Sequence, residues 1–238
     1  NLANMSTTAF NTRRAEFADL HYQKVEQPGT LSASDGTMIP TGIQLGLGVR
    51  TASVAPELAQ GALTQTNGDL DIAIEGRGYL EVALPDGTSA YTRDGGLKRS
   101  ADGQVVNSEG YPLVPDIAIP DEAISLSINA DGEVYAFFSD EPEPELLGQL
   151  TLASFTNARG LEALGGNLFR ETEASGPPNV GDPGTDGLGV MRQGYLETSS
   201  VDAVREVTEL IEAQRAYELN AKVLTAADQM MSTTSQVR

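Results

Sequence analysis

The side chains that most often carry out chemistry are scarce in this chain of 238 residues. It contains no Cys, which removes thiol nucleophiles, disulfides and thiolate metal sites from consideration. Its single His, His21, is the only imidazole available for a Ser-His-Asp triad or a zinc site. His21 stands beside Tyr22 and two residues after Asp19, in a stretch that reads as a helix. We therefore expect it to face solvent or a partner protein.

The remaining motifs for binding or catalysis are incomplete. Asp69 with Asp71, and Asp182 with Asp186, could each hold a hard cation, but neither pair has the spacing of a calcium loop with its closing Glu. Residues 46–48, Gly-Leu-Gly, begin a dinucleotide fingerprint that lacks its third Gly and its helix. There is no G-x-S-x-G element, and no Trp to form a carbohydrate platform. We predict no catalytic, metal-binding or cofactor-binding residue, no cofactor, and hence no enzyme.

Acidic side chains dominate the charge of the chain. The sequence holds 34 acidic and 15 basic residues, for a formal net charge of −19. Nucleic acid and anionic membrane surfaces both attract Lys and Arg, so this balance argues against binding to either. No window approaches 18 consecutive apolar residues, and we predict no membrane insertion. The chain opens at Asn1 without an initiator Met, which suggests that residues upstream are missing.

The segment near the C-terminus has the clearest secondary-structure signal. Residues 201–232 contain no Gly or Pro, and apolar side chains recur there at seven-residue spacing. This pattern predicts an amphipathic helix of roughly 30 residues, about 45 Å long. Ser199 and Asp202 have a spacing close to a capping box, which would begin it.

The apolar stripe of this helix has two interpretations. It could pack across its own domain, or form a coiled-coil-like seam shared with other chains. Gln214 and Asp228 fall near the stripe, and buried polar residues there favour a specified contact between chains. We assign two residues of the N-terminal segment and seven of the helix to this assembly seam: Leu2, Met5, Val204, Val207, Leu210, Ile211, Tyr217, Leu224 and Met231.

The N-terminal segment supplies a possible partner for the tail. Leu2, Met5 and Ala9 have helical spacing, and residues 13–24 read as a second short helix. With both ends of the chain helical, we expect the termini to meet on one side of an inserted domain.

The middle of the chain has the pattern of β-structure. Seven Asx-Gly steps punctuate it, and such steps are a strong hairpin signal. Alternating apolar residues run between them, as in 70–74, 80–84 and 124–128. Short strands at this spacing indicate a sandwich or an open barrel. The sequence therefore predicts an α+β fold, in which N- and C-terminal helices form a coiled-coil-like layer around an inserted, mainly antiparallel β domain.

Several strings, in order along nearly the whole chain, resemble the bacterial flagellar rod and hook family. Residues 1–10, NLANMSTTAF, resemble its N-terminal signature, and residues 73–82, AIEGRGYLEV, its glycine-rich strand. Residues 193–197, QGYLE, and 214–220, QRAYELN, are similar to its C-terminal motifs. Departures from the family pattern are modest, and one of them is Glu75 at a position that is usually neutral or Lys.

The likeness is greatest to the distal rod members of this family, because residues 27–50 resemble a rod-type insertion that hook subunits lack. The residues assigned to this connector are Pro28, Pro40, Gly42, Gly46, Gly48 and Arg50. The resemblance implies three regions: a terminal helical assembly core at 1–24 and 199–238, an extended connector at 25–55, and an outer β-rich domain at 56–198.

The resemblance further implies a structural subunit that polymerises into a hollow helical shaft and transmits motor torque to the hook. Its partners would be further copies of itself, proximal rod and hook subunits, the surrounding P- and L-ring proteins, the rod cap and the export apparatus. Its place would be the flagellar basal body, between periplasm and outer membrane. A proximal rod or hook subunit is the alternative within the family, and an acidic secreted carbohydrate-acting β protein is the alternative outside it.

Overall fold

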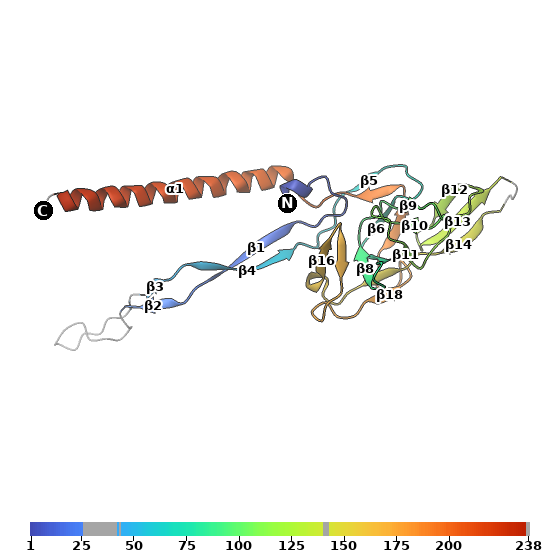
Figure 1. The fold of residues 1–238 in the computed structure, drawn as a ribbon, viewed down its shortest axis with the longest axis horizontal. Coiled ribbons are helices and arrows are strands. Elements are labelled where there is room, and N and C mark those ends of the chain that lie inside the picture. The colour runs from blue at the N-terminus through green and yellow to red at the C-terminus, as the bar shows by residue number, and fades with distance from the viewer. Residues whose placement is uncertain (26–41, 43, 140–142, 237–238) are drawn as a thin grey trace. The chain divides into compact units, whose positions relative to one another are not determined.

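The computed structural model describes residues 1–25, 42, 44–139 and 143–236. The chain divides into two compact units, Asn1–Thr12 with Leu58–Arg238, and Arg13–Glu57. The first unit holds the hydrophobic core and the long helix α1, and the second is a ribbon of paired strands (Figure 1). The predicted connector residues Pro28 and Pro40 lie outside the described residues.

The first unit is built from small antiparallel sheets. Its largest has five strands in the order β11 (Leu113–Val114), β7 (Leu80–Ala83), β8 (Ser89–Thr92), β17 (Leu168–Arg170) and β16 (Glu162–Gly165). A three-stranded sheet follows the order β12 (Ala123–Ile128), β13 (Glu133–Phe138) and β14 (Glu145–Gln149). Four further pairs join β9 (Lys98–Arg99) with β10 (Val105–Val106), β15 (Leu152–Ser154) with β18 (Asn179–Gly181), β6 (Ile72–Glu75) with β19 (Val190–Gln193), and β5 (Leu63–Gln65) with β20 (Tyr195–Glu197).

The core of this unit comes from the alternating runs. Ile72, Ile74, Leu80 and Val82 are almost fully buried, together with residues from the strands around them. A second cluster is aromatic: the Tyr91 and Phe155 rings meet edge to face with centroids 4.8 Å apart, and Tyr79 packs on Phe155 in the same way. The predicted antiparallel β domain is therefore confirmed.

Several of the described Asx-Gly steps form turns, but most of these are not the type I′ turns that such steps favour. At Asp86-Gly87 and Asp131-Gly132 only the glycine has positive φ, 82° in both. The Gly87 N–H donates to the Leu84 carbonyl and the Leu84 N–H to the Thr88 carbonyl, which describes a tight turn closed by a glycine bulge. Asp186-Gly187 alone among the described Asx-Gly steps has positive φ at both residues, as a type I′ turn requires.

Helix α1 runs from Ala203 to Gln236, 34 residues, close to the predicted bounds. Among the described residues before Arg13, the only helical element is the 3-10 turn η1 (Leu2–Asn4); a second 3-10 turn, η2, spans Ala158–Gly160. The predicted N-terminal helix is thus wrong, and the structure shows no coiled coil. No helix of the described chain is long and apolar enough to cross a membrane.

The second unit replaces the predicted helix over 13–24. Strand β1 (Arg13–Asp19) pairs with β4 (Val49–Pro56), and β2 (Tyr22–Lys24) with β3 (Gln44–Gly46), all antiparallel. Phe17 and Leu20 have a spacing that also suits a helix, but residues 13–19 find a complementary strand far along the chain, and strand pairing overrides local preference.

Candidate assembly surface

The start of α1 is fixed to the first unit by its own cap and by the N-terminal segment. Asp202 Oδ1 accepts hydrogen bonds from the N–H groups of Val204 at 2.9 Å and Arg205 at 3.2 Å, so Asp202 alone caps the helix where a pair with Ser199 was predicted. The Asn1 side chain donates to Glu206 Oε1 at 2.8 Å, and the Thr12 N–H to Ser200 Oγ at 2.9 Å. The N-terminal residues therefore contact the start of the helix, whereas the chain ends beyond its far end, so the expected meeting of the two termini is not seen (Figure 1).

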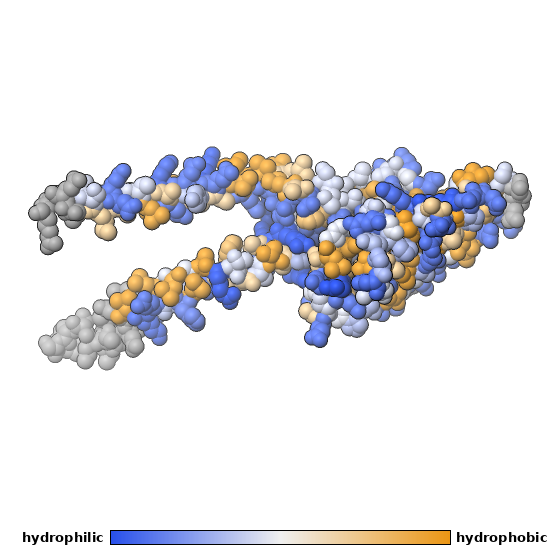
Figure 2. Space-filling view, in the orientation of Figure 1, coloured by the Kyte–Doolittle hydropathy of each residue, from blue (hydrophilic) through white to orange (hydrophobic). Residues whose placement is uncertain are grey.

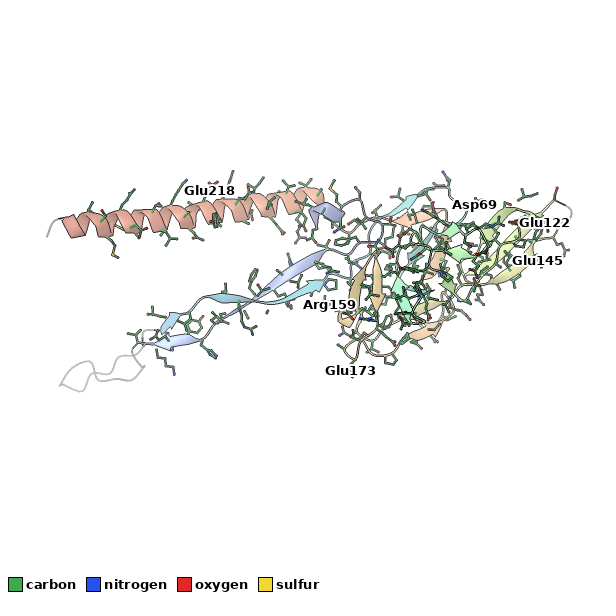
Figure 3. The ribbon with its side chains drawn as sticks, viewed as in Figure 1. Asp69, Glu122, Glu145, Arg159, Glu173 and Glu218 are labelled. Carbon is green, nitrogen blue, oxygen red and sulfur yellow. The ribbon has the colours of Figure 1, made fainter. Side chains whose placement is uncertain are left out.

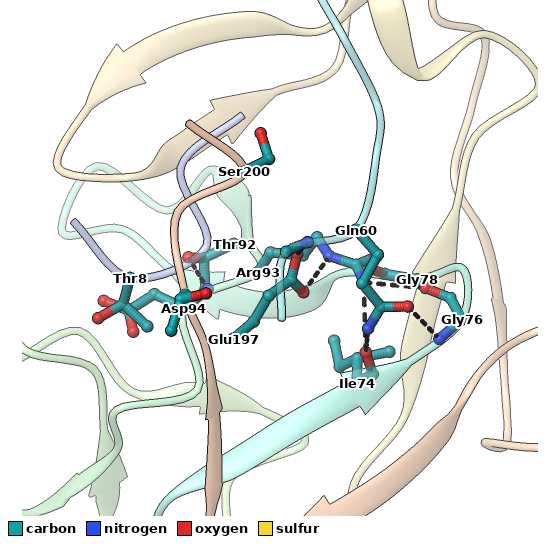
Figure 4. Close-up of polar contacts among 12 residues, drawn as sticks. Thr8, Gln60, Ile74, Gly76, Gly78, Thr92, Arg93, Asp94, Glu197 and Ser200 are labelled. Carbon is teal, nitrogen blue, oxygen red and sulfur yellow. Dashed lines mark hydrogen bonds and ion pairs between the residues drawn. The ribbon is translucent and has the colours of Figure 1, made fainter. Parts of the chain in front are cut away.

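A buried ion pair between Arg93 and Glu197 also stabilises this junction. Arg93 Nε donates to Glu197 Oε2 at 2.9 Å, and the two side chains are only 10% and 3% exposed (Figure 4). The two terminal guanidinium nitrogens donate to the carbonyls of Ile74, Gly76 and Gly78. Because the pair is hydrogen-bonded on both sides, the cost of burying its charges is offset.

Asp94, next to Arg93 in the sequence, is an acid whose pKa is changed by its surroundings. Burial raises the pKa of Asp94, against the opposing effect of the Gly96 N–H, which donates to its Oδ1 at 3.1 Å. Burial likewise raises the pKa of the Tyr91 hydroxyl to about 12. Tyr91 belongs to the buried aromatic cluster with Tyr79.

The seam residues of α1 are presented to solvent along the whole helix. Val204 and Tyr217 are each 77% exposed, and Val207, Leu210, Ile211, Leu224 and Met231 are also exposed, as is Met5. Leu2 is half-buried at the base of the helix, where η1 contacts α1. Figure 2 shows apolar side chains standing out along α1 between charged ones. The stripe is thus uncovered within one chain, which removes the alternative that it packs across its own domain.

A second apolar stripe on α1 was missed by the sequence reasoning. At about 100° per residue, Leu219, Val223 and Met230 form a stripe about 120° around the helix from the seam residues Tyr217, Leu224 and Met231. All three side chains are exposed. The same side of the first half carries charged residues such as Glu209 and Glu212. The signal was available in the sequence, as apolar residues spaced by four and then by seven positions beside the seam.

The ribbon also has one apolar face. Cross-strand pairs place Ala15 opposite Val54, Phe17 opposite Thr51 and Asp19 opposite Val49, so these side chains share a face. Phe17 and Val49 are 67% and 68% exposed. The other face is polar: Ser53 Oγ donates to Glu16 Oε2 at 2.7 Å. An isolated two-stranded ribbon is marginally stable in water, so this face is suited to being covered.

The described connector residues lie at the ends of ribbon strands. Gly46 ends β3, where the Tyr22 ring would be 3.4 Å from an added Cβ. Gly48 has a φ of 110° between β3 and β4, which only glycine adopts readily, and Arg50 lies in β4. Gly42 is half-buried.

The residues weighed for chemistry are scattered. His21 is exposed between β1 and β2, and not on a helix. Asp71 Oδ2 accepts a hydrogen bond from Thr66 Oγ1 at 2.6 Å, as a turn carboxylate does. Within the described residues, no three acidic or His side chains come together in a way that could hold a metal ion. Labelled acids such as Asp69, Glu122 and Glu173 lie apart from one another on the first unit (Figure 3).

Two family models match parts of the first unit. The family model described as "Flagellar hook protein FlgE/F/G D1 domain" matches residues 73–136, which hold the core strands. The model described as "Flagellar basal body rod FlgEFG protein C-terminal" matches residues 192–237, which hold α1.

Full-length relatives extend the match to the rest of the chain. A flagellar basal-body rod protein FlgG of Caulobacter vibrioides is 48% identical over 238 residues, covering 100% of this chain and 91% of that protein. Those of Agrobacterium fabrum and Bacillus subtilis are 44% and 34% identical, over 99% and 97% of this chain and 90% and 88% of theirs. The chain therefore belongs to the family of flagellar basal-body rod proteins, and is a structural part of the basal body and not an enzyme.

Proposed function

We propose that this chain is a subunit of the distal flagellar rod that polymerises through α1 into a hollow helical drive shaft. The observation that carries this proposal is the exposure of nearly every side chain along a helix of 34 residues. A helix of that length with apolar side chains on its surface needs a partner along its length. Helices in proteins are stabilised mainly by packing of their apolar face, and an uncovered apolar surface marks an interaction site.

The contact would be repeated without closing on itself. A patch that meets a different patch on the next copy generates an open helical filament when the rotation does not close a ring. Torque then passes through many moderate contacts per subunit. Residues 199–238, with the first residues of the chain, would form the inner layer, and residues 56–198 the outer domain. Residues 13–24 belong with the connector 25–55 in this scheme, because they are strands of the ribbon.

The finer partners follow from position along the shaft. Proximal rod and hook subunits would meet its two ends, and the P- and L-ring proteins would surround it between periplasm and outer membrane. The rod cap and export apparatus would act during assembly. Residues 27–50, which resemble the rod-type insertion, favour a distal rod subunit over a hook subunit. The carbohydrate-acting alternative is not favoured, since no site for it was found among the described residues.

Electron microscopy of the purified chain over a range of concentrations tests the proposal. A rod subunit should form straight hollow tubes or short stacks above a threshold concentration. A protein that stays monomeric at every concentration and salt condition would contradict the proposed function.

A further inference from the structure

A cavity of about 370 Å³ opens in the first unit beside the Arg93–Glu197 pair. Its apolar wall is formed by the rings of Tyr79 and Phe155, and its rim by the loop 76–78 and by residues 154–159. This volume is at the lower end of the range for small-ligand pockets, and the mixture of aromatic wall and polar rim is typical of them.

The cavity is positively charged in a strongly acidic protein. Three arginines line it, Arg77, Arg93 and Arg159, and its lining includes no Asp or Glu. The charge of Arg93 is already neutralised by its ion pair with Glu197. The side chains of Arg77 and Arg159 are exposed and have no hydrogen-bond or ion-pair partner within the described part of the chain. Two guanidinium groups are therefore free to bind an anion at the same cavity.

Both arginines stand on backbone that is already fixed. The loop before Tyr79 is held by Arg93, which donates to the carbonyls of Gly76 and Gly78, and by Gln60, whose Oε1 accepts from the Gly76 N–H at 3.1 Å. On the other side, the Asn157 N–H donates to the Ser175 carbonyl at 3.2 Å and holds the start of η2, which carries Arg159. Preformed placement lowers the ordering cost of binding.

We propose that this cavity binds an acidic side chain presented by a second copy of the chain, with the carboxylate between Arg77 and Arg159 and its methylene groups against the aromatic wall. Carboxylates pair well with guanidinium groups, which can donate two parallel hydrogen bonds. A second copy is the source because the chain carries 34 acidic residues. Several of them, such as Glu122 and Glu173, are exposed and have no cationic partner within the described residues. The inference rests on the proposed polymerisation.

An NMR titration of the whole chain tests the chemistry of the site. The probes are a capped Ala-Glu-Glu-Ala peptide, its uncharged twin Ala-Gln-Gln-Ala, and inorganic phosphate, and the readout is the amide shifts of residues 76–79 and 154–159. Arg77→Gln and Arg159→Gln should each weaken binding of the acidic peptide about tenfold, as loss of a charged hydrogen bond predicts. Lys98→Gln, an equal loss of charge at an exposed position outside the cavity, should leave it unchanged.

A sedimentation assay of the same variants tests the source of the carboxylate. The proposal expects both arginine variants, but not Lys98→Gln, to need a higher protein concentration to assemble, with unchanged thermal unfolding of the monomer. Equal binding of phosphate and acidic peptide, or no peptide binding, would overturn the assignment of the cavity. Peptide binding without any effect on assembly would overturn the second copy as the source. If the wild-type chain does not assemble, the proposed function fails together with that source, and the titration still decides the chemistry of the cavity.

Discussion

Arg93 and Glu197 form an ion pair, 2.9 Å from Nε to Oε2, that joins the loop after β8 to the strand leading into α1. Glu197 also accepts from the Gly61 N–H through Oε1, and its carbonyl accepts from the Ala9 N–H. The pair thus joins the first residues of the chain, the segment around Gly61 and the strand that leads into the helix. This is the junction through which any force on α1 reaches the β domain.

Removing one member of this pair should be costly. Glu197→Gln leaves the Arg93 guanidinium buried without a counter-charge, and we expect the free energy of unfolding to fall by about 3–5 kcal/mol. The matched control is Glu75→Gln, which breaks the exposed pair with Arg192 and should cost less than about 1 kcal/mol. Urea unfolding followed by circular dichroism measures both. Equal losses in the two variants would contradict the assigned role of the junction.

The sequence predicts those elements of the fold whose pattern comes from residues close together in the chain. The 201–232 helix and the β7–β8 and β12–β13 hairpins are of this kind, because periodicity and turn residues are local. The 13–24 segment does not: Ala15 and Phe17 become one face of a ribbon only when paired with Val54 and Thr51, roughly forty residues away.

The candidate site divides in the same way. The seam from Val204 to Met231 follows from spacing alone, and the structure leaves those residues uncovered. The second stripe through Val223 was present in the sequence but was hidden by the more regular first one. The cavity beside Arg77 and Arg159 could not be found from sequence, since it depends on contacts that bring together loops far apart along the chain.

Stability should change with pH in opposite directions at two carboxylates. Because burial raises the folded-state pKa of Asp94, its charge opposes folding, and stability is lost as pH rises through that pKa. Asp94→Asn should therefore raise the melting temperature at pH 7, and the gain should shrink as the solution is made acidic. Thermal unfolding at several pH values measures this, and a melting temperature lowered at pH 7 would count against the assigned effect of burial.

Asp86 provides the opposite case as a control. Hydrogen bonds from the side chain and backbone of Thr88 lower the pKa of Asp86, so its charge favours folding above the ordinary carboxyl pKa. That contribution is lost as pH falls through the lowered pKa. Asp86→Asn should accordingly reduce the melting temperature at neutral pH and have little effect in strong acid.

Two glycines should respond very differently to an added methyl group. A Cβ on Gly95 would overlap the backbone carbonyl of Ile72, so Gly95→Ala forces the core strand to move and should cost about 2–3 kcal/mol or more. A Cβ on Gly87 meets nothing within 4 Å, and the cost there is only that of a positive φ, about 1 kcal/mol. Chemical unfolding compares them, and similar losses would show that the close approach at Gly95 is easily relieved.

The apolar face of the ribbon should matter for assembly but not for the β domain. Phe17→Ser reduces the apolar area of that face, and we expect tubes that form at higher concentration or bend more, seen by electron microscopy. Ala18→Ser places the same side chain on the polar face and is the control. Because Phe17 is exposed in the single chain, its loss should leave the unfolding of the first unit unchanged. Straight tubes at the wild-type threshold would contradict this role.

Helix α1 should be sensitive on one side in its first half and on both sides in its second. Leu210→Asp and Leu224→Asp put a charge into the seam, and Val223→Asp puts one into the second apolar stripe. All three variants should fail to form sedimentable polymer, because burying an unpaired charge in the contact between subunits is costly. Glu212→Lys changes a charge on the polar side of the first half, and should assemble normally. Since all four residues are exposed in the single chain, the β domain should stay folded. Assembly of Val223→Asp at the wild-type concentration would show that only one side of the helix is covered.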